Sequence, residues 1–215
     1  AVLVAFRARI GELVAALWRW LARRSTADDG GELRFIIAIL VGTALTGAIG
    51  LVLERLGPGG NLKLVSAGFL ATAFLLVLSE RLGARAAPGR RVLSPGPREG
   101  IIVGIAQGIG VLPGVSRSGI TISASLAAGV DREKAGEFSF ILAIPAVLGA
   151  FILELKDAGE LMAELSPAPL VLGLLLAFAS GLAAIKLFLG LVRRSRLSWF
   201  AAYLVPLGIA GLIWL

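Results

Sequence analysis

The chain contains repeated apolar stretches that are each long enough to cross a bilayer. A helix needs roughly 20 residues to span a hydrocarbon core of about 30 Å. Five stretches approach or reach that length, at about 35–54, 64–79, 137–155, 169–192 and 198–215. They lack strand-like alternation and contain scattered glycine, so we expect helices rather than a barrel to satisfy the backbone. Because 57% of the residues are hydrophobic, we predict an all-α, polytopic membrane helical bundle.

Two residue types are missing from the sequence, and this limits the chemistry. The chain has no cysteine, so neither a disulfide nor a thiolate is available, and it has no histidine. Histidine is the commonest acid–base group near neutral pH and the commonest zinc ligand. Hydroxyls, carboxylates, Lys and Arg therefore remain for any reaction. The net charge of +7 does not predict nucleic-acid binding, because the basic residues cluster beside the apolar stretches.

The arginines around the spans predict a topology. Cytoplasmic loops of membrane proteins carry an excess of Lys and Arg, which places the segments before 35, after 80 and after 192 in the cytoplasm. Residues 100–131 must then enter and leave on the cytoplasmic side, because Arg98 and the charged turn at 131–134 flank them. We therefore predict a re-entrant helical hairpin over 100–131, broken at Pro113 and Gly114. Irregular backbone at membrane depth is tolerated only where protein or a wet cavity surrounds it.

The order of these elements suggests inverted repeats. Residues 100–215 give a hairpin followed by three spans, whereas residues 1–82 give a partial apolar segment at 1–6 and two spans. An inverted-repeat membrane fold would have a matching hairpin and a complete span in front. We interpret 1–215 as a single integral membrane domain, with 1–82 as the remainder of a first repeat and 100–215 as the second. We also expect that an N-terminal piece is absent.

The polar segment 113–121 is the strongest candidate for a site. It holds Arg117 between two serines inside an otherwise apolar region, where an arginine costs about 2.5–3.5 kcal/mol. Pro113 ends the first half-helix, and Gly114 permits a tight turn. A second half-helix is predicted to start near Ser116, since serine is a favoured N-cap, and its free N–H groups attract anions.

The side chains of this segment would complete an anion-binding site. The planar guanidinium of Arg117 can donate two parallel hydrogen bonds to a phosphate. Hydroxyls of Ser116, Ser118 and Thr121 add donors or a nucleophile. An alternative is that the aliphatic part of the Arg117 side chain extends its guanidinium to the membrane–water interface. The long apolar runs on both sides of Arg117 make that interface difficult to reach.

Two further polar residues have two interpretations each. Gln107 lies about two turns before the break and offers an amide either to the same pocket or to another helix. Glu137 opens the span after the hairpin. It would be either a carboxylate stabilised by the start of that helix or a partner of Arg117.

The same residues carry a resemblance to a known family. Gln107, the string at 113–119, Thr121 and the segments 136–140 and 143–145 closely resemble the second half of the undecaprenyl-diphosphate phosphatase family, also called bacitracin-resistance proteins. The resemblance extends less sharply over the rest of the chain. It implies a multi-pass enzyme of the bacterial inner membrane that hydrolyses undecaprenyl diphosphate to the monophosphate. Such an enzyme recycles a lipid carrier for cell-wall synthesis and confers bacitracin resistance.

The resemblance also implies roles for individual residues. Arg117 would clamp the diphosphate, Ser116, Ser118 and Thr121 would orient its oxygens, and the substrate would also lie against Gln107, Gly114 and Gly119. A divalent cation, Mg or Ca, is implied as cofactor. The family's glutamate-rich signature, Glu-Gly-x-Thr-Glu-Phe-x-Pro with Ser-Ser-x-Gly-His after it, has no counterpart here, so the expected ligands of that cation are absent from this chain. We therefore expect these 215 residues alone to be nearly inactive.

Other classes of function remain open at this point. Inverted repeats with helices broken at mid-membrane also describe secondary transporters, so a transporter or flippase for polyprenyl phosphate is the main alternative. An inactive fragment that binds this lipid is a third. The expected partners are the polyprenyl diphosphate lipid, the bilayer and, as an open alternative, further copies of the chain in a homo-oligomer, but not nucleic acid.

Overall fold

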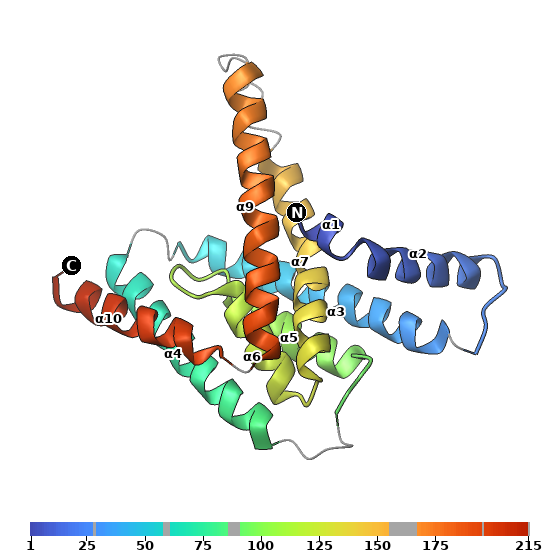
Figure 1. Ribbon diagram of the computed structural model, residues 1–215, viewed down its shortest axis with the longest axis horizontal. Coiled ribbons are helices and arrows are strands. Elements are labelled where there is room, and N and C mark those ends of the chain that lie inside the picture. The colour runs from blue at the N-terminus through green and yellow to red at the C-terminus, as the bar shows by residue number, and fades with distance from the viewer. Residues whose placement is uncertain (28, 58–60, 86–90, 155–166, 195, 215) are drawn as a thin grey trace.

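The computed structural model describes residues 1–27, 29–57, 61–85, 91–154, 167–194 and 196–214 (Figure 1). Helices dominate this part of the chain, and its only strand-like feature is an isolated bridge between Val92 and Val130. All five predicted spans are helical: α3 (Asp29–Arg55), α4 (Leu62–Arg85), α7 (Arg132–Glu154), α9 (Pro167–Arg193) and α10 (Ser198–Trp214). Within the described residues four of them are long and apolar enough to cross a membrane, whereas α10 has 17 residues. The all-α, multi-pass membrane prediction is confirmed.

The N-terminal region differs from the partial apolar segment predicted at 1–6. A short α1 (Val2–Ala5) leads into α2 (Arg7–Leu21), an amphipathic helix that packs beside the beginning of α3. Leu13 and Ala16 face the protein and are buried, whereas the side chain of Trp18 is exposed. Arginines interrupt the apolar residues along this helix, so its apolar face does not form a continuous apolar run in the sequence. Helix α1 lies within the predicted segment, whereas α2 was not predicted.

The segment 100–131 forms most of a helical hairpin, made of α5 (Pro97–Ile109) and α6 (Arg117–Ala127) with an irregular turn at 110–116. That this hairpin is re-entrant stays a prediction. Two backbone hydrogen bonds close the base of the hairpin. The Val92 N–H donates to the Gly129 carbonyl (2.9 Å), and the Asp131 N–H donates to the Val92 carbonyl (3.0 Å). We call this closure the clasp. Helix α5 packs along α3, and α6 packs on α4 and α7. The depth of the hairpin in a bilayer, and the repeat boundaries at 82 and 100, stay predictions.

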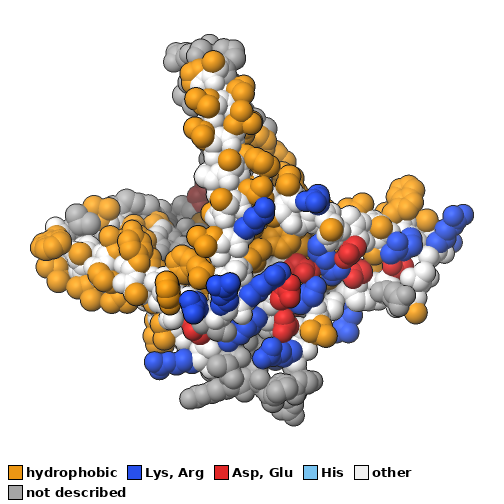
Figure 2. Space-filling view, viewed as in Figure 1, with side chains coloured by type: hydrophobic (Ala, Val, Ile, Leu, Met, Phe, Trp, Pro, Cys, Tyr) orange, Lys and Arg blue, Asp and Glu red, His pale blue; other side chains and the backbone are white. Residues whose placement is uncertain are grey.

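Two clusters of buried apolar side chains hold the hairpin in place. One lies between α2, α3, α5 and α7, and the other joins the far side of α6 to α4 and the region between α9 and α10. Away from these clusters the helices expose apolar side chains, above all on the column formed by α9 (Figure 2). The charged side chains gather in a band at the foot of that column. This division is expected of a protein whose outer surface faces lipid.

Several helix ends meet near the clasp. The Arg132 guanidinium donates to the carbonyl oxygen of Glu80 at the end of α4 (3.3 Å), and the Glu80 carboxylate accepts from the backbone N–H of Ser198 at the start of α10 (2.8 Å). The end of α9 joins them through an ion pair between Arg193 and Glu133 (2.6 Å). The ends that the arginine pattern assigned to one side of the membrane therefore lie together. Which side of the bilayer they face stays a prediction.

A candidate phosphate-binding site at the hairpin break

The turn between α5 and α6 depends on glycine at position 114. Gly114 has φ +83°, in the left-handed region that L side chains rarely adopt. A Cβ atom built there would lie 2.0 Å from the carbonyl oxygen of Val65 on α4. The tight turn predicted at Gly114 is confirmed, and the reason includes a close approach of two backbones that the sequence did not reveal.

Helix α6 begins as predicted, with Ser116 as its N-cap. The Ser116 hydroxyl accepts a hydrogen bond from the Gly119 N–H (3.2 Å), and the Ser116 N–H donates to the Thr72 hydroxyl on α4 (3.0 Å). Neither the N–H of Arg117 nor that of Ser118 has a hydrogen-bond partner within the described part of the chain. These two donors, together with the positive end of the helix dipole, are available to an anion.

The Arg117 side chain lines the largest of the cavities near the break. This cavity encloses about 860 Å³ and lies between α3, the hairpin turn and α7. Its walls are mainly apolar, and among its described lining residues Arg117 is the only base and Glu54 the only acid. No hydrogen bond or ion pair joins the Arg117 guanidinium to any other described residue. A half-buried cation that has no internal partner and lines an apolar cavity can bind a lipid with an anionic headgroup and an apolar tail.

The neighbouring serines face a different cavity. Ser116 and Ser118 line a space of about 370 Å³ whose other walls come from α7, α9 and α10 and include Phe140, Phe188 and Phe200. The structure therefore separates the predicted donor set into the Arg117 guanidinium on one side of the helix start and two hydroxyls on the other. Only the backbone at the beginning of α6 is common to both.

Thr121 and Gly119 lie inside the protein. The Thr121 hydroxyl donates to the Arg117 carbonyl one turn earlier (2.8 Å) and pairs with the Ser139 hydroxyl on α7. Only 1% of Thr121 is exposed, and it does not line the Arg117 cavity. Gly119 is buried against Ser116 and Thr72. Through these two bonds Thr121 joins α6 to α7, one turn after Arg117. The contact of Thr121 with phosphate stays a prediction.

Gln107 makes the interhelical hydrogen bond that was one of its two interpretations. It is fully buried, and its side-chain amide donates to the Thr46 hydroxyl on α3 (3.2 Å). Its amide oxygen has no partner among the described residues, and the same holds for the hydroxyl of Thr43. Thr43 and Thr46 both line the Arg117 cavity. Sequence reasoning missed them, although two hydroxyls one turn apart in an apolar span were a usable signal.

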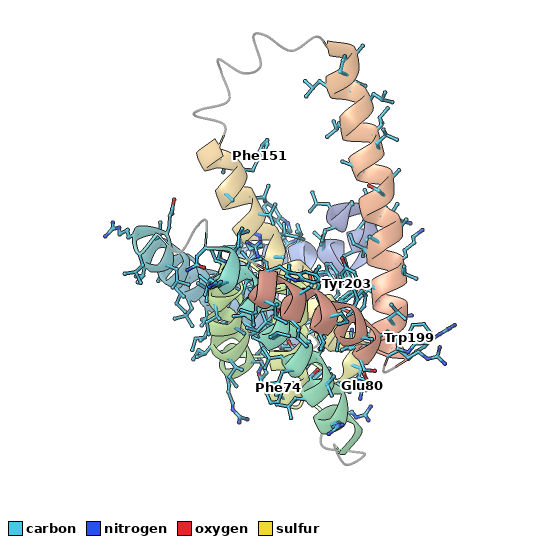
Figure 3. The ribbon with its side chains drawn as sticks, turned by 90° about the vertical axis from the view of Figure 1, so that its left-hand side faces the viewer. Phe74, Glu80, Phe151, Trp199 and Tyr203 are labelled. Atoms are coloured by element: carbon cyan, nitrogen blue, oxygen red, sulfur yellow. The ribbon has the colours of Figure 1, made fainter. Side chains whose placement is uncertain are left out.

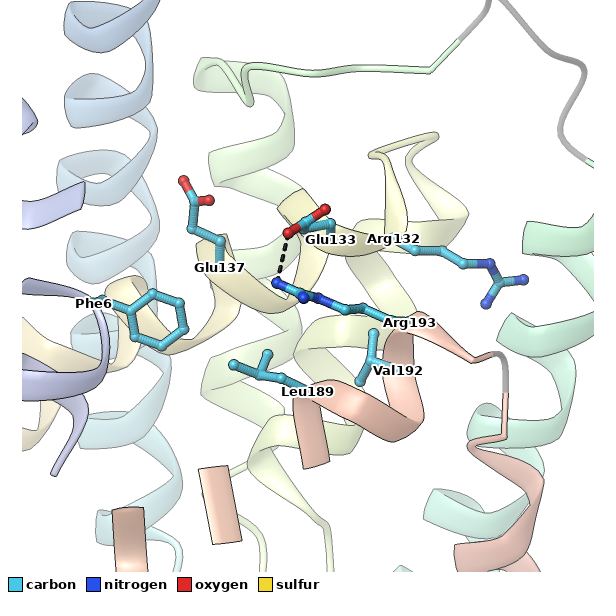
Figure 4. Close-up of a pocket in the computed structure, with 7 residues that line it drawn as sticks. All are labelled: Phe6, Arg132, Glu133, Glu137, Leu189, Val192 and Arg193. Atoms are coloured by element: carbon cyan, nitrogen blue, oxygen red, sulfur yellow. Dashed lines mark hydrogen bonds and ion pairs between the residues drawn. The ribbon is translucent and has the colours of Figure 1, made fainter. Parts of the chain in front are cut away.

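Glu137 contacts Arg9 and Lys134 rather than Arg117. Its carboxylate lies 2.7 Å from the Arg9 guanidinium and 3.0 Å from the Lys134 ammonium. It is the sixth residue of α7, beyond the first turn, and Figure 4 shows it on the side of α7 that faces Phe6. Arg9 also pairs with Glu12 (2.8 Å) and Glu32 (2.6 Å), so it joins α2, α3 and α7. Burial works to lower the pKa of Arg9, but its bonds to these carboxylates hold that pKa above its usual range.

The described residues do not assemble a metal site. No group of three or more Asp, Glu, His or Cys side chains stands close enough together, in the part of the chain that the structure describes, to hold an ion. Glu54 is the only acidic residue among the described residues that line the Arg117 cavity. The divalent cation implied by the family resemblance therefore finds no ligand set here.

The fold defines a helical multi-pass membrane protein with a candidate anion site at the break in a hairpin. Comparison with known proteins agrees: residues 1–210 match the family described as "Bacitracin resistance protein BacA", and the chain belongs to this family. It is 45% identical over 209 residues to an undecaprenyl-diphosphatase of Treponema denticola, covering 97% of this chain and 76% of that protein. An undecaprenyl-diphosphatase of Korarchaeum cryptofilum is 40% identical, with 98% and 78% covered. An undecaprenyl-diphosphatase 2 of Streptomyces coelicolor is 35% identical, with 99% and 76% covered.

Proposed function

We propose that the protein takes part in the hydrolysis of undecaprenyl diphosphate to undecaprenyl phosphate in the bacterial plasma membrane. The relatives that match nearly the whole chain are named undecaprenyl-diphosphatases. The observation that carries the proposal is the Arg117 guanidinium, which has no partner among the described residues and lines a large apolar cavity at the start of α6. Regenerating the monophosphate returns the lipid carrier to cell-wall synthesis, and this accounts for bacitracin resistance.

The geometry supports distinct tasks for the two parts of the site. The Arg117 fork holds phosphate oxygens, and its charge counters the negative charge that develops as the phosphoryl group is transferred. The backbone N–H groups of Arg117 and Ser118 add donors aligned with the helix dipole. The apolar walls between α3 and α7 accommodate the first isoprenoid units of the lipid. Ser116 contributes by fixing the start of α6, through its cap on Gly119 and its bond to Thr72.

The acid–base half of the reaction needs carboxylates that the described residues do not bring to Arg117. A divalent cation and the glutamates that would hold it belong, by family resemblance, to the glutamate-rich signature that this sequence lacks. This chain accordingly supplies substrate binding and charge stabilisation.

The experiment compares two proteins in vesicles that contain undecaprenyl diphosphate. One is the 215-residue chain, and the other is the same chain joined at its N-terminus to a glutamate-rich hairpin of the family. The joined protein should release inorganic phosphate, and the 215-residue chain should bind the lipid with little release. Rapid release by the 215-residue chain would show that the second hairpin suffices. Movement of intact diphosphate across the vesicle wall without release would instead establish a transporter.

A further inference from the structure

Residues 192–194 and 196–199 lie at the junction between α9 and α10, and we call them the α9–α10 corner. The N–H of Arg194 donates to the Gly190 carbonyl (3.2 Å), and the N–H of Arg196 donates to the Leu191 carbonyl (3.0 Å). Leu197 is fully buried in the apolar cluster beside α6. These backbone bonds and the buried Leu197 attach the corner to the end of α9 and to the cluster beside α6.

The carboxylates that the structure brings to this corner already have partners. Glu80 accepts from the Ser198 N–H, and Glu133 pairs with Arg193, as the dashed line in Figure 4 marks. The end of α4, the start of α7 and the start of α10 are joined here by these bonds and by the bond from Arg132 to the Glu80 carbonyl. One Arg132 nitrogen is buried and has no partner among the residues described. The corner thus has more cationic groups than its acids neutralise.

Three exposed arginines account for this excess: Arg81, Arg194 and Arg196. None has a hydrogen bond or an ion pair from its side chain to another residue in the described ranges. The Arg196 guanidinium lies over the Trp199 ring, 5.5 Å from its centroid, and Trp199 as a residue is 66% exposed. Figure 3 shows Trp199 at the beginning of α10, beside the foot of α9. Stacking on a ring orients a guanidinium and leaves its N–H edge available to an oxyanion.

We propose that the α9–α10 corner binds the phosphate headgroup of an anionic phospholipid, with Arg194 and Arg196 as phosphate donors and Trp199 at the level of the headgroup. Tryptophan is enriched at membrane interfaces, and basic pockets between the ends of membrane helices bind anionic headgroups. The acyl chains would lie against α9, which exposes many apolar side chains between Leu170 and Leu187.

This lipid site is separate from the substrate site. The corner packs at the end of α6 that lies near the clasp, whereas Arg117 starts α6 at the break. Helix α6 has 11 residues, so about 16 Å of helix separates the two ends at 1.5 Å per residue. Arg117 also lines a cavity between α3 and α7 to which neither α9 nor α10 contributes a described residue, so the phosphate held by Arg194 and Arg196 is not the one held by Arg117. The proposal does not depend on the enzymatic function.

Native mass spectrometry of the detergent-purified chain provides the test. We expect phosphatidylglycerol to stay bound in preference to phosphatidylcholine with the same acyl chains, and millimolar inorganic phosphate not to displace it. Arg194→Gln with Arg196→Gln should weaken phosphatidylglycerol binding about 30-fold, from about 1 kcal/mol for each charge near an anionic lipid. Arg194→Lys with Arg196→Lys should fall between this variant and the native chain, because the charge remains and the fork is lost.

The matched control is Arg23→Gln with Arg24→Gln, which removes the same charge from two exposed arginines just after the end of α2. It should change phosphatidylglycerol binding less than about threefold. Equal weakening by both double variants would overturn the proposal, because general attraction would then explain the binding. Equal retention of the two lipids by the native chain would overturn it as well. Trp199→Ala leaves every charge in place and should weaken binding several-fold; no change would remove Trp199 from the site.

Discussion

Arg9 on α2 and Arg117 at the start of α6 are both half-buried arginines, but their surroundings are opposite. Arg9 lies within 2.8 Å of three carboxylates, those of Glu12, Glu32 and Glu137, and its guanidinium also sits over the Phe35 ring. Arg117 has no carboxylate partner among the described residues and lines a cavity. Arg9 is a cation whose charge is used to join helices, whereas the charge of Arg117 is left for a ligand.

The difference shows how to recognise a functional arginine in a membrane protein. Both residues are expensive to bury, so burial alone does not separate them. What separates them is the partner: an internal carboxylate neutralises a structural cation, and a cation without one retains its full attraction for an anion. Substitution of the first should therefore reduce stability and substitution of the second should reduce binding and turnover.

The largest expected effect is that of Arg117→Lys. Lysine keeps the charge but loses the two-pronged fork, so in the hairpin-joined protein the rate of phosphate release should fall about 100- to 1,000-fold, equivalent to about 2.7–4 kcal/mol. The melting temperature of the purified protein should stay within a degree or two of the native value. Near-normal release with unchanged expression would mean that the guanidinium geometry is irrelevant and that Arg117 does not differ from Arg9 in the way described.

A smaller effect is expected from Gly114→Ala, which alters the turn that carries Arg117. The new Cβ combines left-handed strain with overlap on the Val65 carbonyl, so the free energy of unfolding should fall by about 2–4 kcal/mol. Gly129→Ala is the matched control, because Gly129 has φ +87° and a Cβ atom added there would meet nothing within 4 Å, so it should cost about 1 kcal/mol. Denaturant melts of both variants measure the difference, and equal losses would show that the α4 contact at Gly114 does not matter.

Arg9→Met should reduce stability without changing turnover per folded molecule. Removing the Arg9 guanidinium leaves the Glu32 and Glu137 carboxylates without this partner. The free energy of unfolding should therefore fall by about 1.5–3 kcal/mol. Thermal melts, together with the specific rate of the folded fraction of the hairpin-joined protein, test this. A loss of specific rate as large as that of Arg117→Lys would erase the proposed distinction between the two arginines.

Gln107→Leu gives the smallest expected effect. It removes the bond to Thr46 along with the unpartnered amide oxygen, so the loss of stability should be about 1 kcal/mol. Thr46→Val is the matched change on the other side of that bond, and the loss in the double variant should be less than the sum of the two single losses. If Gln107→Leu instead raises KM for undecaprenyl diphosphate at unchanged stability, the amide serves the pocket rather than the helix contact.

The sequence predicted the parts of the fold that depend on local patterns. Apolar length located the spans, and Gly114 and Ser116 located the tight turn and the start of α6, because glycine and N-cap serine act on their own neighbourhood. Pro113 was expected to end the first half-helix, but α5 already ends at Ile109, four residues earlier. The extent of α2 was missed, since its apolar face is interrupted by arginines. An interrupted pattern of this kind is found with the helical period rather than with continuous runs.

The site was less predictable, because its arrangement depends on packing between distant segments. Nothing local indicates that Glu137 faces Arg9, which lies more than a hundred positions earlier in the chain. Likewise, adjacent residues on a helix start point in different directions, and this is why Arg117 and its neighbouring serines line different cavities. Sequence patterns identify which side chains are unusual, but tertiary packing decides which of them meet.

The clasp between Val92 and the turn after α6 has a consequence for how the hairpin opens. A helical hairpin tied only at its tip can fray from its two free ends, whereas here the two backbone bonds at Val92 make a closed ring of the segment from 92 to 130. Unravelling either helix from its base first requires breaking the clasp. The amides of Val92 and Asp131 should therefore exchange with solvent deuterium at the same slow rate as those inside α6, as one cooperative unit.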